Sequence, residues 1–238
     1  MPIQLRQPRN VELMPLWIKI CGNTSLADAQ LAADAGADAV GFVLAPSPRR
    51  VSVAEVASIV PYLSPQLEKI GVFVDASFEE IHAAVAGCGL TGVQLHFDAA
   101  EDLSAKLHNF IGQALRVLRV EYFDAGTADS IAEQIAGHAR NPHVDGVLID
   151  SRTATAVGGT GKMFDWIAAQ KTVFADHGSL KLVAAGGLNP DNVAEAIAAL
   201  KPWGVDVVSG VEAAPGRKDA AKVRAFVEQA RQATRLVD

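Results

Sequence analysis

Residues Trp17–Thr24, with the sequence WIKICGNT, form the junction on which the predicted fold of the whole chain depends. Four residues typical of a buried strand lead to Cys21, and a glycine then breaks the run. A helix-like segment begins at once, with Ser25 or Thr24 placed to cap its free N–H groups. A strand that passes directly into a helix is the repeating unit of an α/β fold, and such folds bind ligands at the end of the sheet where this junction lies.

The same pattern recurs to the end of the chain. The predicted strands are Trp17–Cys21, Ala39–Val43, Glu68–Val74, Gly92–Leu95, Leu115–Val120, Gly146–Ile149, Lys181–Ala184 and Val205–Val208. The predicted helices are residues 25–35, 52–62, 77–87, 99–108, 127–138, 162–170, 190–199 and 218–233. Short apolar strands that alternate with helices predict a parallel sheet covered on its outer face. An open doubly wound sheet is the alternative, but eight units in 238 residues favour a single-domain (β/α)8 TIM barrel.

The composition argues against several kinds of protein. Half of the residues are hydrophobic and a fifth are charged, as in a globular protein with a sizeable core. The net charge of −6, without a cluster of Lys and Arg, argues against nucleic acid as a partner. No apolar run suits a membrane span or a signal peptide, so we expect a cytoplasmic protein that does not bind membranes. Two cysteines suggest neither a disulfide framework nor a cysteine-based zinc site.

The first residues do not share the repeating pattern. Residues 1–16 contain three prolines and show no hydrophobic period. We predict a mobile N-terminal extension here, followed by one barrel domain over residues 17–238. A start at Met14 is the alternative.

Polar side chains follow the predicted strands, at the end of a barrel where catalysis takes place. Cys21 follows the first strand, and Arg49 lies in the loop after the second, where a guanidinium can hold a carboxylate through two hydrogen bonds. Gln94 and His96 stand at the end of the fourth strand, and Asp150 ends the sixth. Each also has a plain structural interpretation: a small buried thiol, a solvated arginine, a structural histidine or a turn-forming aspartate.

Glycine-rich turns follow the last three predicted strands: Gly158–Lys162 (GGTGK), Ala185–Pro190 (AGGLNP) and Ser209–Glu212 (SGVE). Glycine lets backbone N–H groups approach an anion, and the dipole of a following helix favours negative charge. Barrels of this kind build phosphate sites from the loops after strands seven and eight. The three turns therefore predict a phosphate-carrying ligand, although the first lacks the spacing of a Walker P-loop.

A thiol and a carboxyl group on opposite sides of such a ligand can act as base and acid in a proton shuttle. Cys21 and Asp150 fit these roles, so the site suits an isomerisation that needs neither metal nor cofactor. Arg119, near the end of the fifth strand, either faces the mouth of the barrel or pairs with a carboxylate near Glu121. The sequence leaves both arrangements open.

Nine segments, in this order, form a highly specific set: Lys19–Gly22, Gly36–Phe42, Ser47–Val51, Val93–His96, Ile149–Ser151, Gly158–Gly161 with Phe164–Trp166, Ala185–Leu188, Gly204–Glu212 and Pro215–Asp219. Through them the chain resembles the phosphoribosylanthranilate isomerase family of tryptophan biosynthesis, from about Ile18 to the last helix. Phe97 and Val208 depart from the family pattern, which often has glycine and serine at these positions.

The resemblance implies an Amadori rearrangement of N-(5-phosphoribosyl)anthranilate to 1-(2-carboxyphenylamino)-1-deoxyribulose 5-phosphate, without metal or cofactor. Asp150 would protonate the furanose ring oxygen, Cys21 as thiolate would remove the proton from C2, and Arg49 would hold the anthranilate carboxylate. Backbone N–H groups of the glycine-rich turns would hold the phosphate. The residues assigned to substrate binding are Arg49, Gln94, His96, Arg119, Gly158, Gly159, Gly161, Gly186, Gly187, Ser209 and Gly210.

Both proton carriers need help from their surroundings. A free thiol is mostly protonated at neutral pH, and Lys19 lies on the same strand face as Cys21 but at an unknown distance. Asp150 must carry a proton near neutral pH, which burial or a neighbouring negative charge would favour.

Two other interpretations remain. Another phosphate-binding barrel enzyme of tryptophan or histidine biosynthesis would have a catalytic lysine with glutamates, or an aspartate in place of Cys21. A non-catalytic sensor of a phosphorylated ligand would have lost Cys21 or Asp150, and both are present. We expect a monomer or a homodimer.

Overall fold

The computed structural model describes residues 16–96, 102–110, 115–123, 128–150, 166–175 and 177–235. Eight parallel strands close into a barrel in chain order, and β8 pairs with β1. The strands are β1 (Trp17–Ile20), β2 (Ala39–Val43), β3 (Glu68–Val74), β4 (Gly92–His96), β5 (Arg116–Tyr122), β6 (Gly146–Asp150), β7 (Lys181–Ala185) and β8 (Gly204–Val207). The predicted TIM barrel is therefore confirmed, and the open sheet was the wrong alternative.

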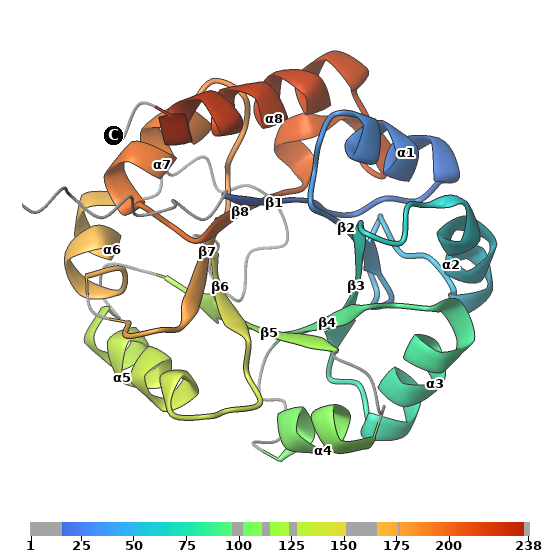
Figure 1. Ribbon diagram of the computed structural model, residues 1–238, viewed down its shortest axis with the longest axis horizontal. Helices are drawn as coiled ribbons and strands as arrows, with labels where there is room; N and C mark the ends of the chain where they lie inside the picture. The colour runs from blue at the N-terminus through green and yellow to red at the C-terminus, as the bar shows by residue number, and fades with distance from the viewer. Residues whose placement is uncertain are drawn as a thin grey trace, which may run out of the picture.

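The helices form an outer ring around the barrel, as Figure 1 shows from one end. They are α1 (Leu26–Asp34), α2 (Val53–Ile59), α3 (Phe78–Cys88), α4 (Leu103–Phe110), α5 (Ala128–Ala139), α6 (Trp166–Thr172), α7 (Val193–Leu200) and α8 (Ala220–Arg235). The side chain of Ser25 accepts a hydrogen bond from the N–H of Asp28 and caps α1, as the sequence predicted. None of the described helices is long and apolar enough to cross a membrane.

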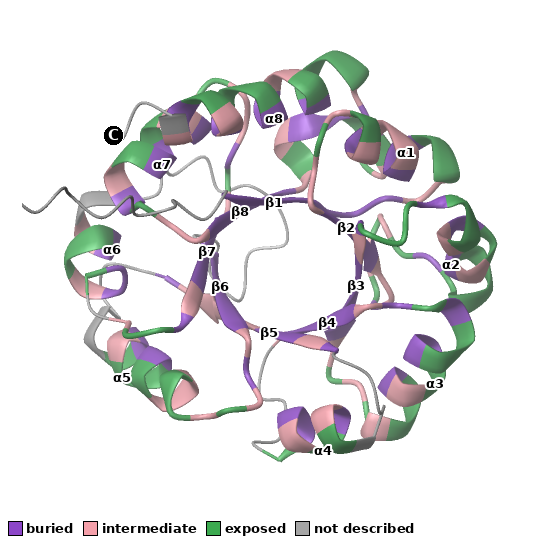
Figure 2. Ribbon diagram, in the orientation of Figure 1, coloured by how far each residue is buried: buried purple, intermediate pink, exposed green. Residues whose placement is uncertain are grey.

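Side chains along each strand alternate between the barrel interior and the helix layer. The apolar part of the interior consists of Trp17, Ala39, Ile70, Leu118, Val120, Leu148, Val183 and Ala185. The residues between them, such as Ile18, Val93 and Val117, belong to a larger cluster packed against the helices. The strands are buried along most of their length, and the helices are buried mainly on the side that faces them (Figure 2). This alternation decides which residues point into the mouth of the barrel.

A short hairpin that the sequence pattern did not predict follows β8. After the turn η3 (Ser209–Val211), strands β9 (Glu212–Ala214) and β10 (Arg217–Lys218) pair in antiparallel fashion. The hydroxyl of Thr24 donates to the carbonyl of Gly216 at 2.6 Å, so the hairpin is tied to the loop after β1. It brings charged residues to the side of Cys21.

The described chain begins at Leu16, which is buried in the cluster between strands and helices. Arg231 of α8 bonds to the carbonyl oxygens of Leu16 and Gly36 and to the carboxylate of Asp38. These bonds fix the start of the barrel. The rest of the predicted N-terminal extension lies outside the described residues.

Candidate active site at the mouth of the barrel

Cys21 and Asp150 lie at the carboxyl ends of two interior strand faces. Cys21 directly follows β1, and Asp150 is the last residue of β6, two residues after the interior side chain of Leu148. Their exposed fractions are 3% and 1%. Only β7 and β8 separate β6 from β1 around the barrel (Figure 1). The thiol and the carboxyl group therefore belong to two walls of the same mouth.

A chain of hydrogen bonds crosses the interior beside Cys21. The ammonium of Lys19 donates to Asp206 Oδ1 at 3.0 Å and to Gln94 Oε1 at 2.9 Å. Gln94 Nε2 lies 2.9 Å from His96 Nε2, and His96 Nδ1 lies 2.8 Å from the hydroxyl of Tyr122. Gln94 and His96 thus do point into the barrel, and they link β8 and β1 to β5.

The positive charge on Lys19 determines which group donates and which accepts in the hydrogen bonds of Gln94. An ammonium can only donate, so Gln94 presents its oxygen to Lys19 and its NH2 group to His96. His96 contacts Gln94 through Nε2 and Tyr122 through Nδ1, so the orientation of its ring is set from both sides.

Arg49 is held by a carboxylate of the hairpin. Its Nε and Nη2 donate to Glu212 at 2.8 and 2.7 Å, a bidentate pair. Lys218 donates to Glu212 Oε1, the oxygen that also accepts from Arg49 Nε, at 3.3 Å, and to the carbonyl of Cys21 at 2.6 Å. Burial alone would raise the pKa of Glu212, but the bonds and charges of Arg49 and Lys218 outweigh it and lower the pKa. Glu212 is thus a carboxylate that joins two cations beside the Cys21 backbone.

The Cys21 thiol is subject to opposing influences. Burial raises its pKa, and the neighbouring Asp206 carboxylate acts in the same direction. The ammonium groups of Lys19 and Lys218 act in the opposite direction, but the net direction is a raised pKa. The thiol therefore depends on its cationic neighbours for whatever thiolate character it has.

Gly41 on β2 provides the space for this arrangement. A Cβ at this position would lie 2.5 Å from Cys21 Sγ, 3.0 Å from Lys19 Cε and 3.1 Å from Cys21 Cα. The first distance is too short for the thiol to stay where it is, and the other two are tighter than most real Cβ contacts. Because Gly41 has no side chain, the thiol of Cys21 and the side chain of Lys19 can lie close together against β2.

A Gly41→Ala substitution is expected to lower kcat/KM by about 10²-fold, because displacing a reacting group by an ångström can have an effect of that size. Steady-state turnover measures this loss. The matched control is Gly137→Ala in α5, where a Cβ would have no neighbour within 4 Å, and which should leave turnover unchanged. Unchanged turnover in Gly41→Ala would contradict the tight packing of the thiol.

The loops after β7 and β8 meet, as the glycine-rich turns predicted. Gly186 and Gly187 both have left-handed backbone, with φ of +82° and +67°. Asn192 donates to the carbonyl of Gly187 at 3.1 Å and holds this turn. A Cβ at Gly210 would overlap the carbonyl oxygen of Leu188, so only glycine fits there. Ser209 and Gly210 begin the turn η3 beside this loop, whereas Gly158, Gly159 and Gly161 lie outside the described residues.

Two of the remaining polar residues lie away from the mouth. Leu118 and Val120 are interior residues of β5, so Arg119 between them faces the helix layer and does not point into the mouth. Cys88 ends α3, donates to the carbonyl of Ala84 at 2.9 Å, and has its pKa raised to about 11 by burial. This setting is that of a structural thiol, and the sequence analysis assigned no function to Cys88 either.

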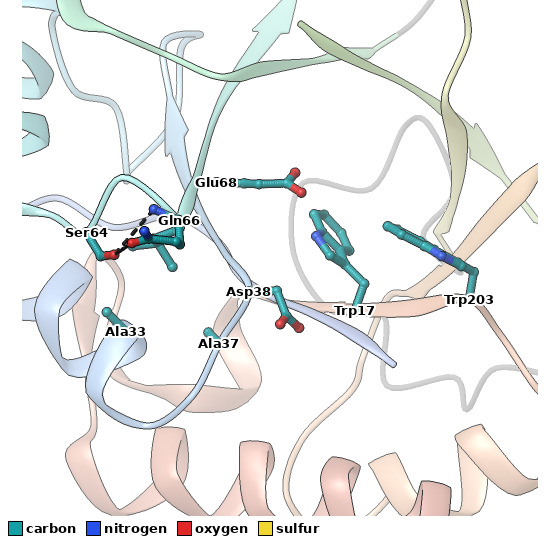
Figure 3. Close-up of a pocket in the computed structure, with 9 residues that line it drawn as sticks. Trp17, Ala33, Ala37, Asp38, Ser64, Gln66, Glu68 and Trp203 are labelled. Atoms are coloured by element: carbon teal, nitrogen blue, oxygen red, sulfur yellow. Dashed lines mark hydrogen bonds between the residues drawn. The ribbon is translucent and has the colours of Figure 1, made fainter. Parts of the chain in front are cut away.

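A separate hollow of about 450 Å³ lies at the amino-terminal end of the barrel. Its lining includes the stacked Trp17 and Trp203, whose ring centroids are 5.2 Å apart, and Asp38 and Glu68 (Figure 3). Asp38 is bonded to Arg231, and Glu68 forms a bidentate pair with Arg116. This hollow is at the opposite end of the strands from Cys21 and Asp150, so it is not part of the candidate active site.

Sequence reasoning missed several members of the site: Gly41, Tyr122, Asp206 and Lys218, and the role of Glu212. It named Lys19 without placing it. The one signal that was available is a charged residue in the middle of an apolar strand, as in Lys19 of β1 and Asp206 of β8. Such a residue is buried only when it is paired, so two of them in one barrel suggest a pair.

Comparisons with known proteins find relatives over nearly the whole barrel. The family described as N-(5′phosphoribosyl)anthranilate (PRA) isomerase matches residues 18–229. The N-(5′-phosphoribosyl)anthranilate isomerase of Trichlorobacter lovleyi is 42% identical over 217 residues, which cover 91% of this chain and 98% of that protein. The crystal structure of phosphoribosyl anthranilate isomerase from Thermotoga maritima has a TM-score of 0.80 and 34% identity, covering 91% of this chain and 99% of that one.

A further solved structure is of a phosphoribosyl anthranilate isomerase in complex with reduced 1-(o-carboxyphenylamino)-1-deoxyribulose 5-phosphate. It has a TM-score of 0.76 and 31% identity, and the match covers 91% of this chain and 99% of that one. The similarity therefore extends over all eight strands, and it includes a protein that holds a phosphorylated ligand.

Proposed function

The chain belongs to the N-(5′-phosphoribosyl)anthranilate isomerase family, and from this premise we propose how the residues at the mouth of its barrel carry out the reaction. It is an isomerase of tryptophan biosynthesis, with N-(5′-phosphoribosyl)anthranilate as substrate. The reaction is an Amadori rearrangement, in which an aminated aldose becomes an amino ketose. Only protons need to be moved by the protein, which suits a site built from a thiol and a carboxyl group.

Asp150 is the general acid in this proposal. It donates its proton to the furanose ring oxygen, the C1–O bond breaks, and the nitrogen lone pair forms a Schiff base at C1. The position of Asp150 at the end of β6, almost fully buried, supports this role because the proton is kept from bulk water.

Cys21 is the general base. Its thiolate takes the proton from C2, and the electron pair of that bond moves toward nitrogen to give an enolamine. The enolamine then tautomerises: C1 gains a proton, the hydroxyl at C2 loses one, and the ketone is formed. The proton count of the substrate is unchanged, but Cys21 ends protonated and Asp150 ionised. The tautomerisation restores both when the Cys21 thiol gives its proton to C1 and the carboxylate of Asp150 takes the proton of the C2 hydroxyl.

Arg49 and the last two loops hold the ends of the substrate. Glu212 engages the Nε–Nη2 edge of the Arg49 guanidinium, and the Nη1–Nη2 edge is the second edge that can hold a carboxylate, here that of anthranilate. The phosphate binds to backbone N–H groups near Gly187 and Gly210, with Gly159 and Gly161 assigned from the sequence alone. The contact between the loops after β7 and β8 supports this placement.

The observation that carries the proposal is the position of Cys21 and Asp150 on two walls of one mouth, both buried at strand ends. The test is turnover of N-(5′-phosphoribosyl)anthranilate, followed by the change in anthranilate fluorescence, before and after treatment with iodoacetamide. We expect alkylation of Cys21 to abolish turnover and the reduced product analogue to protect the thiol.

Peptide mass spectrometry gives the control, because alkylation confined to Cys88 should leave turnover intact. Full turnover with Cys21 fully alkylated would contradict its role. An untreated protein that binds the analogue but shows no turnover would instead support a sensor. A homodimer or monomer in the cytoplasm, without nucleic acid, stays a prediction.

A further inference from the structure

A lysine with no exposed surface lies in the barrel interior beneath Cys21. The exposed fraction of Lys19 is 0%, and its ammonium bonds to Asp206 at 3.0 Å and to Gln94 at 2.9 Å. Transferring an ammonium from water to a protein interior costs several kcal/mol unless its charge and its hydrogen bonds are satisfied. Two of its three N–H donors are accounted for by these oxygens. Lys19 and Asp206 are therefore a built ionic pair within the wall of the site.

The Cys21 sulfur is the third neighbour of this ammonium. Lys19 and Cys21 point to the same side of β1, and both the Cε of Lys19 and the Sγ of Cys21 lie within 3.0 Å of the point that a Cβ of Gly41 would occupy. Burial alone would lower the pKa of Lys19, but the charges of Asp206 and Cys21 and the hydrogen bond to Asp206 outweigh it. The net direction is a raised pKa, so Lys19 stays protonated.

The charged groups that meet around Cys21 come from three elements. Lys19 is on β1, Asp206 on β8 and Lys218 on β10, and behind Lys218 lie Glu212 and Arg49. The carboxylate of Asp28 also lies beside Lys218 and accepts its backbone N–H at 3.3 Å. Of these groups, Lys19 and Lys218 favour the thiolate of Cys21 and Asp206 disfavours it.

Cys88 is a second buried thiol, and no cation is among the groups that shift its pKa. Its thiol is also buried, its hydrogen-bond acceptor is a backbone carbonyl, and its pKa is raised to about 11. Cys21 is more deeply buried than Cys88, with an exposed fraction of 3% against 5%. A thiol in that position needs a counter-charge if it is to lose its proton.

We propose that Lys19 is a positioning residue for the base: its ammonium, clamped by Asp206 and Gln94, pairs with the Cys21 sulfur and stabilises its thiolate against the effect of burial. This rests on the proposed role of Cys21. Asp206 orients the ammonium and also limits its effect, since its own negative charge disfavours the thiolate. The two members of the pair therefore act on Cys21 with opposite signs.

The experiment is alkylation of Cys21 by iodoacetamide as a function of pH in the full-length protein, followed by mass spectrometry of the Cys21 peptide. In Lys19→Met the titration is expected to move to higher pH, with alkylation at pH 7.5 about tenfold slower or more, because a unit charge a few ångströms away is lost. In Asp206→Asn it should move to lower pH. A merely structural role would not move the two variants in opposite directions.

Lys19→Met leaves Asp206 buried without its partner and so carries a risk of misfolding. The Lys19→Met/Asp206→Asn double variant removes both charges. It differs from the Asp206→Asn variant only in the Lys19 ammonium, so comparing these two proteins isolates the effect of that charge on Cys21. The matched control is Lys69→Met, since Lys69 is also buried but bonds to the carbonyl of Ser64 and faces away from the interior. Its Cys21 titration should equal that of the wild type.

Equal alkylation profiles in the double variant and Asp206→Asn would overturn the pairing of Lys19 with Cys21. The pH dependence of kcat/KM tests the role of Cys21 separately: its acidic limb should follow the alkylation profile to higher pH in Lys19→Met. If alkylation shifts and this limb does not, Lys19 is confirmed as the partner of the thiol and Cys21 is not the base. A failure of the Lys19–Cys21 pairing and a failure of the proposed role of Cys21 as the base therefore give different results.

Discussion

Replacing Asp150 by asparagine, or Cys21 by serine, is expected to lower kcat by about 10³-fold, within the range known for loss of a general acid or base. Asparagine has the shape of aspartic acid but no acidic proton to give to the ring oxygen. Serine has nearly the shape of cysteine, but its hydroxyl forms far less of the anion than a thiol does. Both substitutions conserve volume, so thermal unfolding should change little.

The two roles can be told apart by isotopic substitution. In the proposed sequence Cys21 breaks the C2–H bond and Asp150 acts earlier, when the ring opens. Turnover of substrate deuterated at C2 should therefore show a primary isotope effect in Cys21→Ser and none in Asp150→Asn. The double variant should be about as slow as the slower single variant, because each change raises the barrier of a different step.

The reverse isotope pattern would exchange the roles of the two residues. A variant that keeps more than a tenth of the wild-type kcat would exclude its residue from the chemistry. Circular dichroism of each variant provides the control for folding.

The fold could be predicted because its signals are local and repeat eight times. Each strand is an apolar run with a turn behind it, and most strand ends were correct within one residue. The largest difference is β5, predicted as Leu115–Val120 and observed as Arg116–Tyr122. Its last two residues, Glu121 and Tyr122, are polar and only half-buried, so they gave no apolar pattern to follow.

The same lack of pattern left Arg119 undecided. In Arg116–Tyr122 an arginine stands on each face, and alternation alone does not say which face is inside. Leu118 and Val120 decide it only when the barrel is seen to pack them together. Cys21 and Asp150, by contrast, end apolar runs, and every parallel strand of a closed barrel delivers its last residue to the same mouth.

The supporting residues could not be predicted because their partners are far away along the chain. Lys19 and Asp206 are 187 residues apart and meet only because β8 closes the barrel beside β1. Arg49 and Glu212 are 163 residues apart, and a hairpin with no local signal brings them together. Such pairs depend on the register of closure, which short-range periodicity does not contain.

Glu212 is a residue outside the chemistry whose loss should have a large effect on stability. A Glu212→Gln variant keeps the volume but removes the carboxylate charge that Arg49 and the buried Lys218 share. Removing one partner of a buried ion pair costs about 3–5 kcal/mol. For a chain of this size that corresponds to a drop in melting temperature of roughly 6–20 °C, measured by calorimetry.

Activity should fall with stability, by about 10²-fold in kcat/KM, because Arg49 loses the bond that orients it toward the substrate carboxylate. The matched control is Glu68→Gln, which breaks another bidentate pair, with Arg116, at the amino-terminal end of the barrel. Glu68 and Arg116 are partly exposed, so the control should cost less stability and leave kcat/KM unchanged. An equal loss of activity in both variants would contradict the role of Glu212.

The pH dependence gives this prediction a second measurement. The pKa of Glu212 is lowered in the folded protein from its ordinary value of 4.5, so its carboxylate stabilises the fold above that pH. This contribution is lost as the pH falls through the lowered pKa, where the folded protein takes up the proton. Glutamine has no such titration, so the difference in unfolding free energy between wild type and Glu212→Gln should be largest near neutral pH and shrink in acid. A difference that stays constant down to acid pH would show that the variant is destabilised by packing and not by the loss of charge.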